Sequence, residues 1–337
     1  MKKNHFSTDS FLIFIKNQRV LENKLATFAF YNVENFYAKK SINQESFLPS
    51  NYAKWIDNRY DVKVDRIAHA ISKIGLKDTQ DLPFFVGLCE VEDESVLNDI
   101  IRNDRLSDAN YDYIFKESLD ERKINVCCLY RKDKIKIIES DPIRVVFKDL
   151  NNIKSYTRDI LYVKAELEKS LFHCFIVHLP SKLDQEVNQE KRKILLGKIR
   201  LKINSILEED PEAKIMVMGD FNDTPTADNI RIELDTRACV DEVKSTQLYN
   251  PMVGLMSYKR GSLVHRKQWM LFDQILFSKG FLTNFSNLEF VKTDIFDASF
   301  LSTNIGKLGA FPSRTFIGSK YLGGYSDHFP VFAIIKY

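Results

Sequence analysis

Short apolar runs recur along the chain and are too short for helices, so they predict buried β-strands. The clearest strands are predicted at Leu25–Tyr31, Pro83–Cys89, Leu171–Val177, Ile215–Met218 and Val331–Ile335. Further strands are predicted at Tyr111–Phe115, Asn125–Tyr130, Lys134–Ile138, Ile160–Val163 and Leu271–Phe277.

Three segments instead repeat their apolar residues at helical spacing. These predicted helices are Asp61–Lys73, a short one after the acidic start Glu92-Asp93-Glu94, and Gln185–Leu207. Gly75 is expected to cap the first helix at its C-terminus. The third helix carries many Lys and Arg residues, which predict a solvated outer face. Its inward residues are expected to be Ile194, Leu195, Ile199, Ile203 and Ile206.

The order of these segments predicts one domain. Residues 1–24 precede the first predicted strand and are interpreted as an N-terminal extension. Residues 294–324 contain many glycine, serine and threonine residues, and we expect a long functional loop there. Because no internal repeat, linker or break in composition divides the chain, residues 25–337 are predicted to form a single α/β domain.

Composition is that of a protein with a sizeable core. Apolar residues make up 44% and charged residues 28% of the chain. The formal net charge is only +3, whereas nucleic-acid-binding domains usually show a strong basic excess. A local basic groove beside acidic metal ligands is compatible with this charge, so composition neither indicates nor excludes a nucleic-acid substrate.

Cysteine usage and the N-terminus predict a soluble, cytoplasmic protein. The five cysteines form no CxxC pair, and four lie in apolar runs, as buried thiols of a reducing compartment do. The apolar run Phe11–Ile15 is shorter than a signal-peptide core and precedes no small-residue cleavage site. No stretch approaches the length of a membrane span. We expect the protein to act as a monomer.

Polar residues lie at or near the ends of the apolar runs in six places. The most informative is Gly219-Asp220-Phe221-Asn222-Asp223, where Gly219 is expected to turn the backbone sharply as the strand ends. The other places are Asn32 with Glu34, Glu90, His178, Asp273, and Asp327 with His328. Loops at one edge of a sheet can converge on a common crevice, so we expect these residues to form one site.

The residue types predict metal-assisted phosphoryl chemistry. Several carboxylates in one crevice repel each other unless a cation is bound. The candidate ligands are oxygen atoms, which favours Mg²⁺, or Mn²⁺ in its place, over zinc. A carboxylate can take a proton from water or orient it, and an amide can fix that carboxylate or a phosphate oxygen.

Each residue also has an ordinary structural explanation, which is the more frequent one for any single position. These explanations are a turn at Gly219–Asn222, a helix cap for Glu90, a sheet-edge contact for His178, an ion pair of Asp273 with Arg266 or Lys267, and a turn cap at Ser326-Asp327. Taken together, they require six coincidences of the same kind.

Seven runs in this order resemble the endonuclease/exonuclease/phosphatase superfamily, the DNase-I-like group. They are Asn-Val-Glu-Asn, Leu-Cys-Glu-Val-Glu, Thr-Arg-Asp-Ile-Leu, His-Leu-Pro-Ser, Gly-Asp-Phe-Asn-Asp, Asp-Gln-Ile and Ser-Asp-His-Phe-Pro-Val. The resemblance extends from about residue 25 to the C-terminus. The tail Gly323–Pro330 is most similar to uncharacterised bacterial members.

The resemblance implies a four-layer α/β sandwich, in which two β-sheets lie face to face with helices outside. It also implies roles for particular residues. The implied metal ligands are Glu90, Asp327 and Glu34. The implied catalytic residues are His178, Asp220, Asn222, Asp273 and His328, with Asp220 activating water and Asp273 orienting His328. Asn32 and Arg158 are the implied phosphate-binding residues.

Two features depart from the resemblance. Many bacterial relatives carry Asn-His-Trp-Pro-Ser, whereas this chain has Val177-His178-Leu179-Pro180-Ser181. Relatives also often carry a glycine-bearing acidic loop where this chain has Asp120-Glu121-Arg122-Lys123. These departures concern substrate contacts more than the chemistry.

The leading hypothesis is a Mg²⁺-dependent phosphodiesterase that acts by direct in-line attack of water. DNA is the first choice of substrate, because aromatic and basic residues share one predicted loop region: Tyr258, Lys259, Arg260, His265, Arg266, Lys267 and Trp269. The same region also fits a plain polar surface loop.

Alternative substrates are a phosphoinositide, a sphingolipid head group or a small nucleotide. A non-catalytic binding module is the remaining alternative. Endonuclease and exonuclease action are not distinguished.

Overall fold

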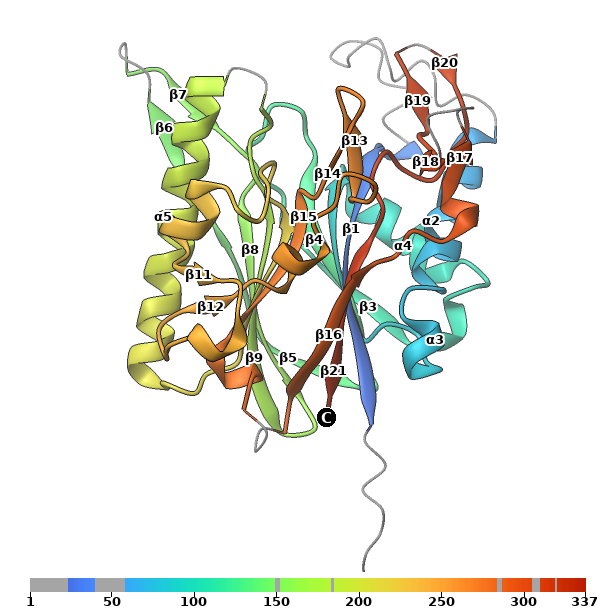
Figure 1. Ribbon diagram of the computed structural model, residues 1–337. Helices are drawn as coiled ribbons and strands as arrows, with labels where there is room; N and C mark the ends of the chain where they lie inside the picture. Colours follow the sequence, from blue (N-terminus) through green and yellow to red (C-terminus); the bar gives the residue numbers. More distant parts are fainter. Residues whose placement is uncertain are drawn as a thin grey trace, which may run out of the picture.

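The computed structural model describes residues 24–39, 58–148, 152–182, 185–283, 287–304, 310–318 and 320–337. Two β-sheets face each other, and helices cover the outer side of each, which gives four layers (Figure 1). The predicted α/β sandwich is confirmed. The predicted N-terminal extension lies outside the described residues except for Lys24.

The two sheets contain most of the strands. The first sheet has six strands in the spatial order β16 (Glu289–Ile295), β21 (Val331–Lys336), β1 (Leu25–Phe36), β2 (Phe85–Val91), β4 (Asn125–Arg131) and β3 (Tyr111–Phe115). The second has seven strands in the order β11 (Thr236–Arg237), β12 (Leu248–Tyr249), β15 (Asp273–Ser278), β10 (Ile215–Asp220), β9 (Ser170–His178), β8 (Ile160–Leu167) and β5 (Ile135–Ile143). The remaining strands form the pairs β6 (Val146–Lys148) with β7 (Lys154–Tyr156), β13 (Leu263–His265) with β14 (Gln268–Met270), β17 (Ser302–Asn304) with β18 (Ala310–Pro312), and β19 (Phe316–Ile317) with β20 (Lys320–Tyr321).

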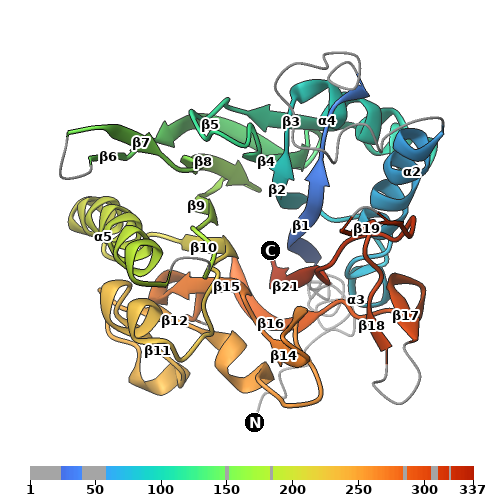
Figure 2. The same cartoon turned by 90° about the horizontal axis from the view of Figure 1, so that it is seen from above.

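The α-helices form the two outer layers (Figures 1 and 2). The first sheet is covered by α2 (Arg59–Ile71), α3 (Leu76–Thr79) and α4 (Glu94–Arg102), and the second by α5 (Gln185–Glu209). Short 3₁₀ turns occur at Ser107–Ala109, Val240–Glu242, Pro251–Leu255, Lys279–Phe281 and Ser299–Leu301, and a π-helical turn at Asn229–Glu233. Among the described residues, no helix is both long and apolar enough to cross a membrane.

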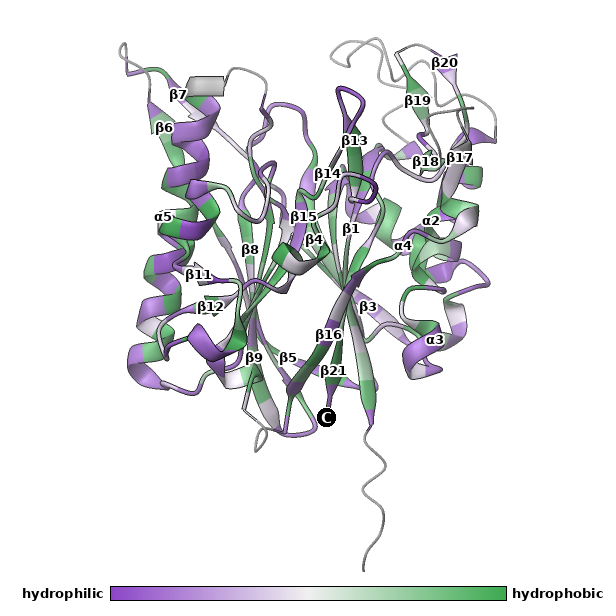
Figure 3. Ribbon diagram, viewed as in Figure 1, coloured by the Kyte–Doolittle hydropathy of each residue, from purple (hydrophilic) through white to green (hydrophobic). Residues whose placement is uncertain are grey.

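Apolar faces fix how the outer layers pack. On α5, Leu195, Leu196, Ile199 and Ile203 are buried against the second sheet, while polar residues face outward (Figure 3). The expectation that Ile194 points inward is wrong, since its exposed fraction is 38%. Each helical residue turns by about 100°, so the inward stripe passes through Leu195 and Leu196 and leaves the preceding position at its edge.

Aromatic side chains fill the space between the sheets. Phe172 of β9 packs edge-on against Phe28 of β1, with ring centroids 5.4 Å apart. It makes a similar contact with Phe85 of β2 at 6.2 Å. These three rings are fully buried. The sheets are therefore held face to face by a dry aromatic layer beneath the edge where the polar residues lie.

Several predicted boundaries differ from the structure. Strands β1, β2, β9 and β10 continue into the polar runs that were expected to be loops. Gly75 does not cap α2, because Ser72 does, and Gly75 instead precedes α3 with a left-handed φ of 68°. The segment 294–324 is not one long loop, since its described part contains a 3₁₀ turn and the strand pairs β17–β18 and β19–β20.

Strand direction brings the polar residues to one edge. The pairs β1–β2 and β9–β10 are parallel, so their C-terminal ends lie together. Strands β15 and β21 run antiparallel to β10 and β1, which places their first residues at that same edge. Asp220 is thereby paired in register with both His178 and Asp273. Sheet topology alone thus assembles residues that are far apart in the sequence.

Gly219 is needed for close approach of two strands rather than for the expected turn. A Cβ atom at this position would lie 2.2 Å from the carbonyl oxygen of Val177 on β9, and φ is 156°. We expect Gly219→Ala to destabilise the protein by about 2–4 kcal/mol, because the overlap involves backbone atoms that cannot move aside. The free energy of unfolding in urea measures this effect.

Gly197→Ala in α5 is the matched control. No atom lies within 4 Å of the position that its Cβ would occupy. Alanine in a helix interior should stabilise the protein by about 0.5–1 kcal/mol, because alanine loses less backbone entropy on folding. Equal effects of the two substitutions would contradict the close-approach explanation for Gly219.

Candidate active site

Asn32, which lies on β1 just before its register shift with β2, joins the two sheets through its side-chain amide. Its Nδ2 donates to Asp220 Oδ2 in the second sheet at 3.1 Å and to Glu90 Oε1 on the neighbouring strand at 3.4 Å. The side chain is buried. An amide donor therefore lies between two carboxylates that would otherwise repel each other.

Backbone irregularities shape this edge. The pairing of β1 with β2 shifts register between Asn32 and Phe36, and the pairing of β2 with β4 shifts between Cys89 and Val91. Glu90 and Glu34 lie in these irregular stretches with left-handed φ angles of 68° and 53°. For a residue other than glycine, this conformation costs about 1–2 kcal/mol and is characteristic of functional sites. β-Bulges re-aim side chains, and here two glutamates lie in such stretches.

His328 and Asp273 form a buried hydrogen-bonded pair. His328 Nδ1 donates to Asp273 Oδ2 at 2.7 Å, and His328 Nε2 lies 3.9 Å from Asp220 Oδ2. Burial by itself would lower the pKa of His328, but the charge of Asp273 and its hydrogen bond raise that pKa well above its usual value. Asp273 Oδ1 has no hydrogen-bond partner among the described residues. The pair therefore presents an imidazole whose orientation is fixed by a carboxylate.

Asp220 ends β10 and is held by the following loop. The backbone N–H of Asn222 donates to Asp220 Oδ1 at 2.9 Å, and the Asn222 side chain donates to the carbonyl of Leu179 at 2.9 Å. Burial and then the charge of Asp273 raise the pKa of Asp220 to about 7. A carboxylate in this environment is suited to accept a proton near neutral pH.

His178, at the end of β9, is a further residue that the second sheet places in the cluster. Its Nε2 lies 3.7 Å from Glu90 Oε1 and 3.8 Å from Asp220 Oδ2. Burial, followed by the charge of Arg158, lowers the pKa of His178 well below its usual value, so the ring is neutral. Its Nδ1 has no hydrogen-bond partner among the described residues. Asn32, Glu90, His178, Asp220, Asp273 and His328 are thus brought into one cluster.

Glu34 and Asp327 lie beside this cluster but have protein partners of their own. Glu34 Oε2 accepts a hydrogen bond from the backbone N–H of Thr315 at 2.6 Å. Burial and the charge of Asp327 raise the pKa of Glu34 to about 7. Asp327 Oδ2 accepts from Arg314 Nη2 at 2.6 Å.

Arg158 is buried, and its described contacts are made with the protein. Its Nη2 donates to the carbonyl of Leu179 at 3.0 Å, and Nη1 lies 3.5 Å from Asp120 Oδ2. These contacts tie the segment after β9 to the loop before β4. Phosphate binding by Arg158 stays a prediction.

Three residues near the cluster were not predicted from the sequence to belong to the site. Arg122 Nη2 donates to Asn35 Oδ1 at 2.7 Å, and the Asn35 N–H in turn donates to Glu90 Oε2 at 2.7 Å. Ser262 accepts from the N–H of Asp273 at 3.3 Å. Lys63 is buried on α2. Only Lys63 left a signal in the sequence, because it shares the helical stripe of apolar residues that includes Ile67.

Two sets of residues are candidates for holding a metal ion. Asp220, Asp273 and His328 offer ligand atoms within 4.8 Å of one another. However, one nitrogen of His328 already donates to Asp273, and an imidazole with a raised pKa carries the proton that a metal ligand must lose. Glu90 and Asp327 expose 12% and 26% of their side chains, compared with 3% for Asp220, and so are more open to an ion from solvent.

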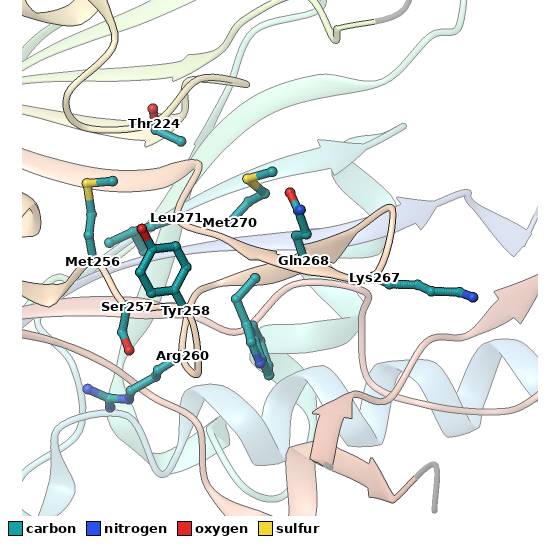
Figure 4. Close-up of a pocket in the computed structure, with 10 residues that line it drawn as sticks. Thr224, Met256, Ser257, Tyr258, Arg260, Lys267, Gln268, Met270 and Leu271 are labelled. Atoms are coloured by element: carbon teal, nitrogen blue, oxygen red, sulfur yellow. The ribbon is translucent and has the colours of Figure 1, made fainter. Parts of the chain in front are cut away.

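A cavity of about 610 Å³ adjoins the segments that carry Asp220 and Asp273. Its wall is formed by the β13–β14 hairpin and the preceding turn, and Figure 4 shows Tyr258, Met256 and Met270 around it. Thr224, which follows the Asp220 loop, lines the opposite side. Leu263 of the hairpin pairs with His328 through a β-bridge. The cavity is therefore connected to the polar cluster through the backbone.

The sequence profile described as "Endonuclease/Exonuclease/phosphatase family" matches residues 27–337. The chain belongs to this family. Proteins of the family are phosphoester hydrolases, and the predicted resemblance is confirmed. No curated protein matches the chain in sequence.

Solved structures of the family share the fold. An endonuclease/exonuclease/phosphatase family protein from Bacteroides thetaiotaomicron is 14% identical with a TM-score of 0.56, over 93% of this chain and 95% of that one. D. rerio TDP2 complexed with a single-strand DNA product is 14% identical with a TM-score of 0.54, over 94% and 100%. The human Nocturnin catalytic domain with a bound sulfate anion is 13% identical with a TM-score of 0.52, over 93% and 95%. At these identities, the likeness concerns the fold alone.

We expect the Asn32 amide to stabilise the folded protein when no metal is bound. In Asn32→Asp, a carboxylate would replace the donor between Asp220 and Glu90. We expect the free energy of unfolding to fall by about 2–4 kcal/mol at pH 7.5 in EDTA, because an unpaired buried charge is left beside two others. Urea denaturation measures the change.

Asn32→Ala is the control for this prediction. It removes the hydrogen bonds without adding charge, so its loss should be smaller, at about 1–3 kcal/mol. Lowering the pH to 5 should reduce the difference between the two variants, because protonation removes the added repulsion. A difference that does not change with pH would contradict this account.

Proposed function

We propose that the chain is a metal-dependent phosphodiesterase that hydrolyses DNA by direct in-line attack of water. The observation that carries the proposal is the His328–Asp273 pair facing Asp220 at the edge where Glu90 also lies. This arrangement joins a proton acceptor with an oriented imidazole, and the neighbouring hydroxyls of Ser262 and Ser326 are bonded to backbone groups. Such a site fits hydrolysis without a covalent enzyme intermediate.

The roles follow from the geometry of the side chains. Asp220, held by the N–H of Asn222, would accept a proton from the attacking water. His328 Nε2, oriented through Nδ1 by Asp273, would stabilise the charge that develops on the phosphate oxygens. Neutral His178, beside Glu90 and Asp220, would contact the phosphate or the leaving group. Asn222 and Asn32 would keep the carboxylates in place.

Mg²⁺, or Mn²⁺ in its place, fits the donor set. Glu90 would hold the ion together with Asp327, since both are oxygen donors with access to solvent. When bound, the ion would neutralise charge on the phosphate oxygens. Asn35 fixes Glu90 through its backbone N–H, so the carboxylate is already oriented without the ion.

The cavity beside the site supports a nucleic-acid substrate. Tyr258 is fully exposed at 101%, and an exposed aromatic ring offers a face on which a base can stack. Trp269 also lines the cavity, and it stacks on Phe329, the residue after His328, with ring centroids 6.0 Å apart. Lys267 is among the residues that line the cavity. The D. rerio TDP2 structure, which shares the fold, is a complex with a single-strand DNA product.

A small nucleotide is the second candidate substrate. The cavity of about 610 Å³ is within the range that encloses a single small ligand, roughly 300–1,000 Å³. The chemistry would be the same, and the difference would lie in whether flanking nucleotides contribute to binding.

Metal-dependent nicking of supercoiled plasmid tests the proposal directly. Purified protein with Mg²⁺ should nick the plasmid, and EDTA should abolish the reaction. Asp220→Ala and His328→Ala should lower the rate by at least about 10²-fold each, because each removes a group that acts in the transition state. Agarose gel analysis of initial rates measures the loss.

Folding of each variant must be verified by circular dichroism. Retained activity in either folded variant would show that the site assignment is wrong. A plasmid left intact, together with turnover of a small chromogenic phosphodiester, would favour the small-nucleotide candidate. With a chiral phosphorothioate substrate, retention of configuration at phosphorus would contradict direct attack by water.

Tyr258→Ala should separate DNA binding from the chemistry. Since the ring is fully exposed, its removal should leave stability unchanged. We expect KM for a short oligonucleotide to rise about 5–100-fold, the effect of losing one stacked base, with KM for the chromogenic diester unchanged. Leu201→Ala, which truncates an exposed side chain on α5, is the control. Equal KM values for Tyr258→Ala and wild type would argue against stacking at this ring.

A further inference from the structure

Arg314 is a guanidinium beside the candidate site that no role above uses. Its Nη2 donates to Asp327 Oδ2 at 2.6 Å, and its Nε lies 4.0 Å from Glu34 Oε1. About half of its side chain, 47%, is open to solvent. Arg158, by contrast, is buried against the carbonyl of Leu179. Arg314 is therefore better placed than Arg158 to meet a ligand that arrives from solvent.

Thr315, the next residue, is fixed from two sides. Its backbone N–H donates to Glu34 Oε2 at 2.6 Å, and its hydroxyl accepts from Lys63 Nζ at 2.6 Å. Lys63 also donates to the carbonyl of Tyr325. Lys63 and Thr315 are each only 1% exposed. A buried ammonium is costly unless its hydrogen bonds are satisfied, so these contacts resist displacement.

The segment that carries Arg314 is also joined to the run before His328. The N–H of Gly324 donates to the Arg314 carbonyl at 2.9 Å, and the N–H of Ser326 donates to the Ser313 carbonyl at 3.0 Å. A Cβ atom at Gly324 would lie 2.0 Å from the Ser313 carbonyl oxygen, so glycine permits this approach. Ser326 in turn donates through its hydroxyl to the Asn32 carbonyl at 2.6 Å. The position of Arg314 is thus tied to the strand that carries Asn32.

The Glu34 carboxylate accepts hydrogen bonds from the segment that carries Arg314. Its Oε2 accepts from Thr315, and its Oε1 accepts from the N–H of Phe316 at 3.4 Å. Its side chain is 8% exposed, which is less than that of Glu90 at 12% or Asp327 at 26%. Both carboxylate oxygens of Glu34 are therefore occupied by backbone N–H donors of the protein.

We propose that Arg314 contacts a phosphate oxygen of the substrate and that Glu34, Lys63 and Thr315 are positioning residues that hold Arg314 in place. The proposal rests on the phosphodiesterase function proposed above. Glu34 would then anchor a loop rather than bind metal. Guanidinium suits this task because its planar fork can contact Asp327 and a phosphate together, which an ammonium cannot do with the same geometry.

Steady-state kinetics of Arg314 variants on an oligonucleotide test the phosphate contact. In Arg314→Gln, KM should rise about 10–100-fold with kcat changed by less than about threefold, as expected for loss of a charge-assisted hydrogen bond that is present in the bound ground state. Arg314→Lys should recover only part of the loss. Arg105→Gln is the matched control, because Arg105 is similarly exposed at 42% and is also paired with an aspartate, Asp65. An unchanged KM in Arg314→Gln would overturn the contact.

Hydrogen exchange tests the anchoring independently of activity. In Glu34→Gln and in Thr315→Val, the amides of Thr315, Gly324 and Ser326 should exchange at least about tenfold faster than in wild type, since local opening becomes easier. Thr315→Ser, which keeps the hydroxyl, should behave like wild type. Mg²⁺ affinity, measured by calorimetry, should be unchanged in Glu34→Gln. A large loss of Mg²⁺ affinity with unchanged exchange would overturn the anchoring and restore Glu34 as a metal ligand.

Binding without turnover separates failure of this proposal from failure of the proposed function. A fluorescent oligonucleotide is titrated by anisotropy in EDTA against Asp220→Asn, with and without Arg314→Gln. Weaker binding in the double variant supports the Arg314 contact even if the wild-type chain hydrolyses no DNA. Equal binding by the two proteins contradicts it, whatever the outcome of the plasmid assay.

Discussion

The structure depends on how buried negative charge is balanced where the two sheets meet. Asp220 and Asp273 are paired in register on adjacent strands, and Glu90 reaches the same edge from the other sheet. Burial, and after it the charge of Asp273, raise the pKa of the Asp220 carboxyl to about 7. The Asn32 amide and the His328 imidazole supply the donors that make the cluster tolerable. A bound cation would further offset the repulsion between these carboxylates. The same buried negative charge therefore both destabilises the cluster and suits it to bind a cation.

The fold makes this cluster possible by distorting its own strands. Glu34, Glu90 and Asn222 have left-handed backbone angles that side chains rarely adopt. Glu34 and Glu90 lie near the ends of β1 and β2, which carry Phe28 and Phe85 of the aromatic layer around Phe172, and Asn222 follows the end of β10. The regular part holds the ends in conformations that would relax in an isolated loop. Glycine would relieve the strain at Glu90, but it would also remove the carboxylate.

The apolar runs and polar strand ends predicted one α/β domain with a shared polar edge, because they are local signals, whereas the four-layer sandwich was implied by the resemblance to the family. His178 and Asp220 could be expected together, since parallel strands must end at the same side of a sheet. Asp273 joins them because it begins β15, which runs antiparallel to β10. The two hydrogen bonds of Thr315 could not be expected from the sequence. Its N–H donates to Glu34 and its hydroxyl accepts from Lys63, and both partners are more than 250 residues away in the chain. The turn expected at Gly219 was wrong for a related reason. Local patterns show where glycine is required, but not whether a turn or a neighbouring backbone requires it.

The charges near the site constrain how a polyanion could be held. Arg122 lies beside Glu90 through Asn35, and Arg314 lies beside Asp327, so the acidic cluster has guanidinium groups near two of its carboxylates. With a net charge of only +3, the chain has little long-range attraction for DNA. Affinity would then come from a few short-range contacts with phosphates and from stacking at Tyr258 rather than from a broad basic surface. Since the slope of log K against log salt scales with the number of neutralised phosphates, such binding should depend only weakly on salt. Under the proposed function, such a site would select a substrate by local shape around the scissile bond and would not need to bind long stretches of duplex.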